Sequence, residues 1–213
     1  MDCVASKMRA CWIGVPPKPD GNNTDLRHLM KQLMESPIVR RRCPRRCGVL
    51  GELDSPPDGC SNPHTLGIED GTIPDENFRA SDSNDVNLPE MARLNAPTYW
   101  SPKFQDAYRW IEVDLIQTTR VSGIITQGQQ LEFTSFLVSK FKVSYQSTPS
   151  SYEYVRTGNG DIQVFDGGDI KSASTPHTNY FNQSVMASVF RIYPQEWIVV
   201  IALRFELLQC SQD

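Results

Sequence analysis

The segment FLVSKFKVSY, residues 136–145, alternates apolar and polar side chains over most of its length. A period of two is the pattern of a β-strand with one face buried and one face in water. No helical pattern of about 12 residues occurs after residue 60, so the sequence predicts an antiparallel all-β sandwich or barrel. Shorter alternating or apolar runs that support this lie at residues 110–115, 120–125, 152–155, 162–165, 189–193 and 198–208.

Length and composition exclude several classes of protein. The chain has 213 residues and a mass of 24.1 kDa, and 39% of its residues are hydrophobic. This suits one globular domain with an extension. The longest apolar run, residues 197–203, is too short for a membrane-spanning helix, which needs about 20 residues. The net charge of -4 gives no overall electrostatic footprint for nucleic acid.

The composition changes near residue 60. Residues 1–59 carry a net charge of +3 and are rich in proline, whereas residues 60–213 carry a net charge of -7. Such a break indicates two different parts of the chain. We therefore expect an N-terminal extension or linker over residues 1–59, a domain over residues 60–210, and a short tail over residues 211–213.

The six cysteines follow the same division. Cys60 and Cys210 bracket the expected domain, and a disulfide between them would join its two ends; two free thiols in a cytosolic protein are the alternative. The remaining cysteines could pair locally or link copies of the chain into a homo-oligomer. These are Cys3, Cys11, Cys43 and Cys47. The histidines are scattered and no Cys-x-x-Cys occurs, so we expect no zinc site.

The extension is mostly irregular and holds one short helical pattern. Apolar residues recur at helical spacing over residues 26–34, after a possible N-cap at Thr24 and before Pro37. Five arginines lie within residues 40–46. This cluster is consistent with a solvated linker, a processing site or a polyanion-binding patch. Asn22 and Asn182 begin Asn-x-Ser/Thr sequons, which are glycosylated only if the chain is secreted.

Four segments of the expected domain resemble the discoidin domain, also called the coagulation factor V/VIII type C domain. They are residues 66–81, 92–128, 136–147 and 190–210, and they occur in family order. The stretch SPKFQD, residues 101–106, is most similar to retinoschisin-type members. The resemblance implies an eight-stranded antiparallel jelly-roll β-sandwich with adjacent termini, which agrees with pairing of Cys60 and Cys210. It also implies a non-catalytic extracellular module.

In this family, loops called spikes at one end of the sandwich bind phospholipid, collagen, glycans or proteins. The resemblance places spike one at residues 81–91, spike two at residues 95–101 and spike three at residues 129–135. These loops are rich in acids and amides, which favours a glycan or glycoprotein ligand on a cell surface or in the matrix. The polar candidates are Asn84, Asp85, Asn87, Gln129, Gln130 and Glu132, with Tyr99 to stack on a sugar.

The alternative is a peripheral membrane module for anionic phospholipid. Its apolar candidates are Val86, Leu88, Leu131 and Phe133, although Leu131 and Phe133 could instead tuck under their loop. Carboxylates in the same loops disfavour an anionic surface. A calcium ion near Asp82 and Asp85 is a further hypothesis, because hard cations bind clustered oxygens; otherwise we expect no cofactor.

The sequence contains no motif for catalysis. A Gly-rich phosphate loop, Gly-x-Ser-x-Gly and His-Glu-x-x-His are all absent from it. The first 20 residues lack the apolar run of a signal peptide and are broken by prolines. We therefore expect a secreted or extracellular protein whose true N-terminus is missing or which is a fragment of a longer chain, rather than a cytosolic protein.

Overall fold

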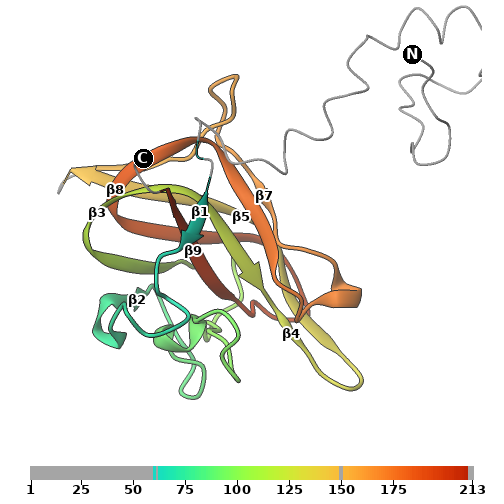
Figure 1. The fold of residues 1–213 in the computed structure, drawn as a ribbon. Coiled ribbons are helices and arrows are strands. Elements are labelled where there is room, and N and C mark those ends of the chain that lie inside the picture. The colour runs from blue at the N-terminus through green and yellow to red at the C-terminus, as the bar shows by residue number, and fades with distance from the viewer. Residues whose placement is uncertain (1–59, 61, 149–150, 211–213) are drawn as a thin grey trace, which may run out of the picture. The chain divides into compact units, whose positions relative to one another are not determined.

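The computed structural model describes residues 60, 62–148 and 151–210 (Figure 1). The chain divides into two units, Met1–Glu52 and Leu53–Asp213, and every described residue belongs to the second. The predictions for the helical pattern, the arginine cluster, the four cysteines of the N-terminal extension and Asn22 lie outside the described residues.

The domain is built from antiparallel strands, as the alternating sequence predicted. One curled sheet runs in the order β1-β9-β3-β8-β5-β4, with β2 paired to β3 and both β6 and β7 paired to β5. Nine strands are described instead of the expected eight, and two of them have only two residues. They are β1 (Pro63–Thr65), β2 (Phe78–Ala80), β3 (Ile111–Gln127), β4 (Gln129–Gln130), β5 (Ser135–Thr148), β6 (Ser151–Tyr154), β7 (Phe165–Asp166), β8 (His177–Ile198) and β9 (Arg204–Cys210).

Strand β5 shows why the alternating segment folds as it does. Phe141 and Val143 are buried, while Lys140 and Lys142 are partly exposed, and both lysines pair with β8. Register shifts interrupt β3, β5 and β8, and bulges of this kind bend a strand. The described helices are single 3-10 turns at Asp75–Asn77, Pro89–Ala92 and Ile170–Ser172. None of them could span a membrane.

Aromatic side chains fill the core between the layers of the curled sheet. The rings of Phe141 and Phe165 stack with centroids 5.4 Å apart, and Phe181 packs 5.6 Å from Phe165. Phe190 and Phe205 are also fully buried. Each such side chain contributes about 1.5–3 kcal/mol through burial, so this cluster makes a rigid base for the loops.

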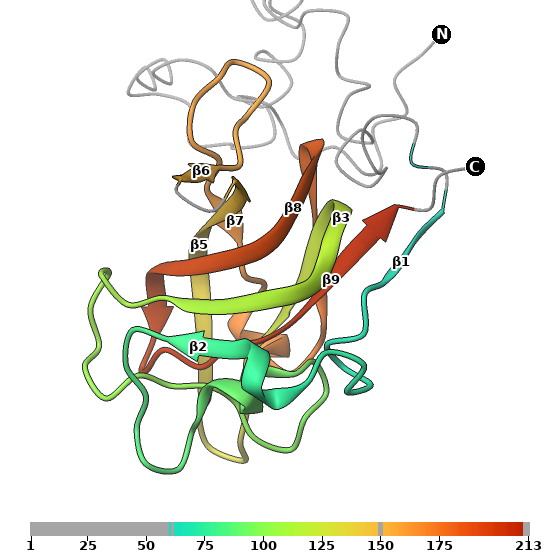
Figure 2. The ribbon, with the colours of Figure 1, turned by 90° about the vertical axis from the view of Figure 1, so that its left-hand side faces the viewer.

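The two ends of the domain lie together. A disulfide joins Cys60 to Cys210, whose Cα atoms are 5.7 Å apart, and β1 pairs with the end of β9 (Figure 2). Beside this seam the buried carboxylate of Glu206 accepts hydrogen bonds from the backbone N–H groups of Glu69 and Leu207. Burial raises the pKa of Glu206, and these N–H donors oppose that rise.

Candidate binding face at the loop end

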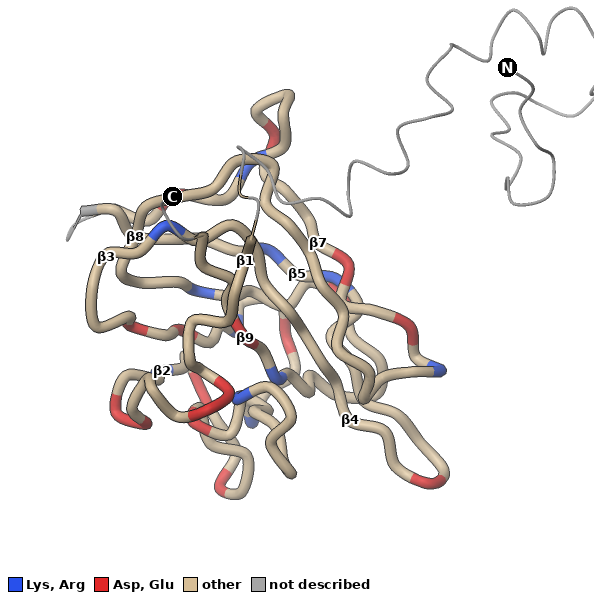
Figure 3. Tube along the Cα trace, in the orientation of Figure 1, with Lys and Arg blue, Asp and Glu red and all other residues tan. Residues whose placement is uncertain are grey.

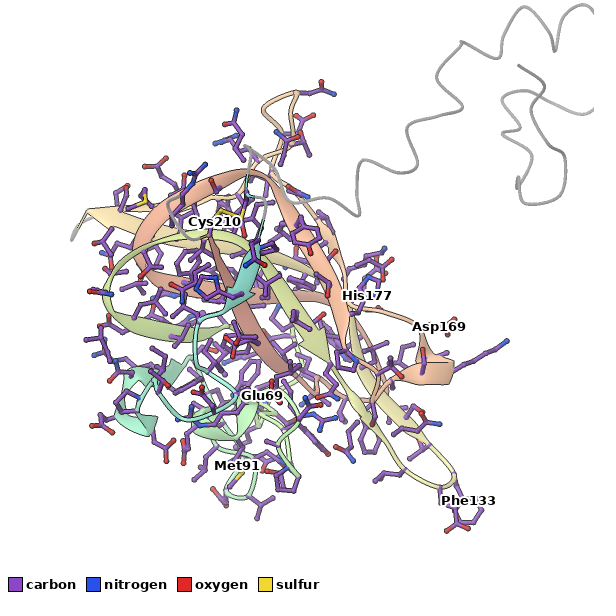
Figure 4. All side chains as sticks on the ribbon, viewed as in Figure 1. Glu69, Met91, Phe133, Asp169, His177 and Cys210 are labelled. Atoms are coloured by element: carbon purple, nitrogen blue, oxygen red, sulfur yellow. A yellow bond between two sulfur atoms is a disulfide. The ribbon has the colours of Figure 1, made fainter. Side chains whose placement is uncertain are left out.

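Spike three is a hairpin that presents two apolar side chains. Gln129 and Gln130 pair with the start of β5, and Leu131 N–H donates to Thr134 O at 2.8 Å to close the tip. Leu131 is 48% exposed and Phe133 is 91% exposed. Figure 4 shows Phe133 at the tip of the hairpin, pointing away from the sheet. These side chains are therefore not tucked under the loop.

Spike one is held by its own asparagines. Asn84 Oδ1 accepts hydrogen bonds from the backbone N–H groups of Val86 and Asn87 at 2.9 and 3.0 Å. Asn84 Nδ2 donates to Asn87 Oδ1, and Asn87 Nδ2 donates to Tyr99 O, which fastens this loop to spike two. Both amides are thus engaged within the fold, while Asp85 and Val86 are exposed and Leu88 is half-buried at the start of the 3-10 turn.

Spike two connects the other two loops through Tyr99. Its ring packs against Phe136 of β5 with centroids 6.1 Å apart, and burial raises the pKa of the Tyr99 phenol. Trp100 is fully buried, and its Nε1–H donates to Asp82 O in spike one at 3.1 Å. The part of Tyr99 that remains exposed can contact a ligand, but most of its contacts are structural.

Two buried side chains at the base of spikes two and three were missed by the sequence analysis. Arg204 Nη1 donates to Ala96 O at 2.6 Å, and Nη2 donates to Gly128 O. Gln127 exchanges hydrogen bonds with Asn95 through both ends of its amide, at 2.9 and 3.0 Å. These bonds join residues distant in sequence, so no local pattern could have revealed them.

A fourth loop, residues 102–110, adds aromatic surface that was also missed. Phe104 is 59% exposed and Tyr108 is 85% exposed. Arg109 lies over the Phe104 ring at 5.7 Å and forms a 2.7 Å ion pair with Asp106, whose pKa is lowered by that hydrogen bond. The signal in the sequence was the pair of aromatics between Lys103 and Arg109, which interleaves apolar and basic side chains.

The two aspartates considered for calcium have different surroundings. Asp82 Oδ2 accepts the backbone N–H of Phe104 at 3.1 Å, while Asp85 is exposed at the tip of spike one. Within residues 60, 62–148 and 151–210, no three side chains of the His, Cys, Asp or Glu type are grouped to hold a metal ion. The calcium hypothesis therefore stays a prediction.

The loop end carries more acid than base. Residues 81–110 and 129–135 hold five Asp and Glu against three Lys and Arg. Figure 3 shows acidic positions at the tips of the loops at the lower end of the domain. The described face thus combines exposed apolar side chains with a net negative field.

Sequence relatives are found among blood coagulation proteins. The chain is 36% identical over 162 residues to coagulation factor VIII of Mus musculus, covering 72% of this chain and 7% of that protein. It is 32% identical over 161 residues to retinoschisin of Takifugu rubripes, covering 71% of this chain and 56% of that protein. The chain thus spans only part of the length of these relatives.

A solved structure and a family model agree with this fold. Wild-type discoidin II from Dictyostelium discoideum matches with a TM-score of 0.60 and 20% identity, covering 75% of this chain and 61% of that chain. The F5/8 type C domain model matches residues 77–207. With the sheet, the joined ends and the loop face described above, this match establishes that the chain belongs to the F5/8 type C domain family.

Proposed function

We propose that this chain is a secreted, non-catalytic recognition module that docks on a cell-surface or matrix glycoprotein through its loop end. The observation that carries the proposal is Phe133, 91% exposed at the tip of a hairpin closed by main-chain hydrogen bonds. A large exposed apolar side chain on a rigid support is typical of a binding anchor. Val86 and Tyr108 extend the apolar contact on neighbouring loops.

The charge of the face favours a protein surface. Asp85 and Glu132 are exposed beside the apolar tips and would be repelled by anionic headgroups. A partner with an apolar pocket and a basic rim would accept both kinds of group. The amides of spike one already hold their own loop, so glycan hydroxyls would be bound by the exposed side chains of Gln130 and Glu132 in spike three.

Binding of the labelled chain to intact cultured cells tests this function. Phe133→Ser should weaken binding about 10-fold or more, because burial of a Phe side chain contributes about 1.5–3 kcal/mol. Ile116→Ser is the matched control, since Ile116 is 68% exposed on β3 outside the loops and should leave binding unchanged. Protease treatment of the cells should remove binding. Equal binding by the Phe133 and Ile116 variants would contradict the proposal.

Phe133 also supports a second candidate function, which is docking on an anionic phospholipid surface. Phe133 and Leu131 could enter the acyl region, while Lys103 and Arg109 lie beside Phe104 on the fourth loop. Flotation with phosphatidylserine-rich and neutral liposomes, with and without calcium, separates this candidate from the first. Selective flotation abolished by Phe133→Asp would establish lipid docking, and absence of flotation would reject it.

The four cysteines of the N-terminal extension suggest that weak loop contacts are multiplied in an oligomer. Linked copies bind a surface with an effective affinity well above that of one copy. A non-reducing gel of the secreted chain should show a ladder that collapses on reduction. A single monomer band would reject a role of Cys3, Cys11, Cys43 and Cys47 in assembly.

A further inference from the structure

A cleft of about 310 Å³ opens at the end of the domain opposite the β4–β5 hairpin. It lies between β8 and the turn after β6, which is the orange loop at the top of Figures 1 and 2. Neither the spikes nor the fourth loop contributes to it. Its volume is at the lower end of the range for small-molecule sites, about 300–1,000 Å³.

The walls of the cleft combine apolar and hydrogen-bonding side chains. Tyr145 and Val185 supply apolar surface from β5 and β8, and both are partly buried against the core. Glu153, Arg156 and Gln183 supply hydrogen-bonding groups. An apolar wall with carboxylate, guanidinium and amide groups around it matches a sugar ring, which has apolar faces and a polar rim.

Asn182 stands at this cleft and begins the sequon Asn182-Gln183-Ser184. Its side chain is exposed, and the amide faces Gly158 of the opposite turn. A Cβ added to Gly158 would lie 3.4 Å from Asn182 Oδ1 and 3.6 Å from Nδ2. The side-chain amide, including the nitrogen that would bear a sugar, therefore lies beside Gly158, which also lines the cleft.

We propose that Asn182 carries an N-linked glycan whose first N-acetylglucosamine lies in this cleft. Nδ2 would form a bond to C1 of a sugar carried on a lipid-linked pyrophosphate donor, losing one proton while the C1–O bond breaks and the lipid pyrophosphate leaves. The modification rests on the secretory route in the proposed function. It covers one end of the domain with the chain's own glycan and leaves the spike end as the recognition face.

The first test is glycopeptide mass spectrometry of the full chain secreted from animal cells. Asn182 should be occupied, and Ser184→Ala should abolish that occupancy while Ser184→Thr, which keeps the sequon, retains it. Occupancy at Asn22 alone would show that the chain was exported but would overturn the inference. Absence of sugar at both asparagines would overturn it as well, whereas cell binding through Phe133 tests the proposed function independently.

The second test asks whether the first sugar lies in the cleft. Trimming of the glycan to a single N-acetylglucosamine should leave the melting temperature unchanged, because the contacting ring remains. Asn182→Gln should lower it by about 2–4 °C, the shift for a small loss of stability in a domain of this size.

Gly158 provides a matched pair of variants. Gly158→Ala should retain the stabilisation by the glycan, because the added Cβ meets Asn182 only at ordinary contact distance. Gly158→Leu fills the space beside the amide and should remove the difference between the glycosylated chain and Asn182→Gln. Equal melting temperatures for the trimmed chain and Asn182→Gln would overturn the placement of the sugar in the cleft.

Discussion

Arg204 is a buried cation with no carboxylate partner among the described residues. It is 5% exposed, its guanidinium donates to two loop carbonyls, and burial lowers its pKa. A charge in such a place is costly unless hydrogen bonds compensate for lost water. The free energy of burying this guanidinium therefore depends on the positions of Ala96 in spike two and Gly128 just before spike three.

Arg204→Met should lower the free energy of unfolding by about 2–4 kcal/mol. The substitution keeps apolar volume but leaves the buried Gly128 O and the partly buried Ala96 O without their donor, at about 1–3 kcal/mol each. Urea unfolding followed by tryptophan fluorescence measures the change. Arg79→Met is the control, because the Arg79 side chain is 64% exposed and its loss should cost below about 1 kcal/mol. A similar loss for both variants would contradict the anchoring role.

The raised pKa of Tyr152 predicts that the stability of the domain falls at strongly alkaline pH. Burial raises its pKa to about 12, with help from its hydrogen bond to the Glu112 carboxylate at 2.6 Å. The unfolded chain loses the phenolic proton near pH 10, so the contribution of Tyr152 is present below pH 10 and is lost as the pH rises through about 12. A tyrosinate absorbance titration should show a component near pH 12 that disappears in Tyr152→Phe and persists in Tyr108→Phe.

At the scale of elements, the chain just after β7 approaches β5 too closely for any side chain at Gly167. A Cβ there would lie 1.7 Å from the backbone oxygen of Val138 and 2.8 Å from its carbonyl carbon. The Gly167 N–H also donates to Ser139 O at 2.9 Å. Neither atom of Val138 can move without displacing the strand that supports spike three.

Gly167→Ala should destabilise the domain by about 3 kcal/mol or more, because the strands must separate to admit a methyl group. Gly158→Ala is the matched substitution, with 3.4 Å to its nearest neighbour, and should change stability by well under 1 kcal/mol. Denaturant midpoints of the two variants provide the comparison. Equal midpoints would contradict the prediction, because they would show that the strands can separate at little cost in stability.

The sequence predicted the elements better than the loop surfaces. Alternation in residues 136–145 identified β5, because strand burial has a fixed period. The same information could not place Phe133 outside its loop or assign the amide of Asn84 to its own turn, because both depend on tertiary geometry. Phe104 and Tyr108 lie outside the spikes that the resemblance supplied, so they were missed despite a visible aromatic and basic pattern.

At the scale of the whole domain, the disulfide should dominate the response to reduction. Cys60 and Cys210 are separated by 150 residues, and closing a loop of that length contributes about 5 kcal/mol in the chain-entropy model. The double variant Cys60→Ser, Cys210→Ser should lower the melting temperature by more than about 10 °C. Calorimetry under non-reducing conditions measures it, and a shift of only a few degrees would contradict this estimate.

The seam between Cys60 and Cys210 also determines how the domain responds to tension. A pull applied at Cys60 and Cys210 passes through the disulfide that joins their side chains, so the sheet between them is bypassed. The domain therefore neither lengthens nor unravels when it is stretched through its ends. Its loop face keeps its shape while force crosses the molecule.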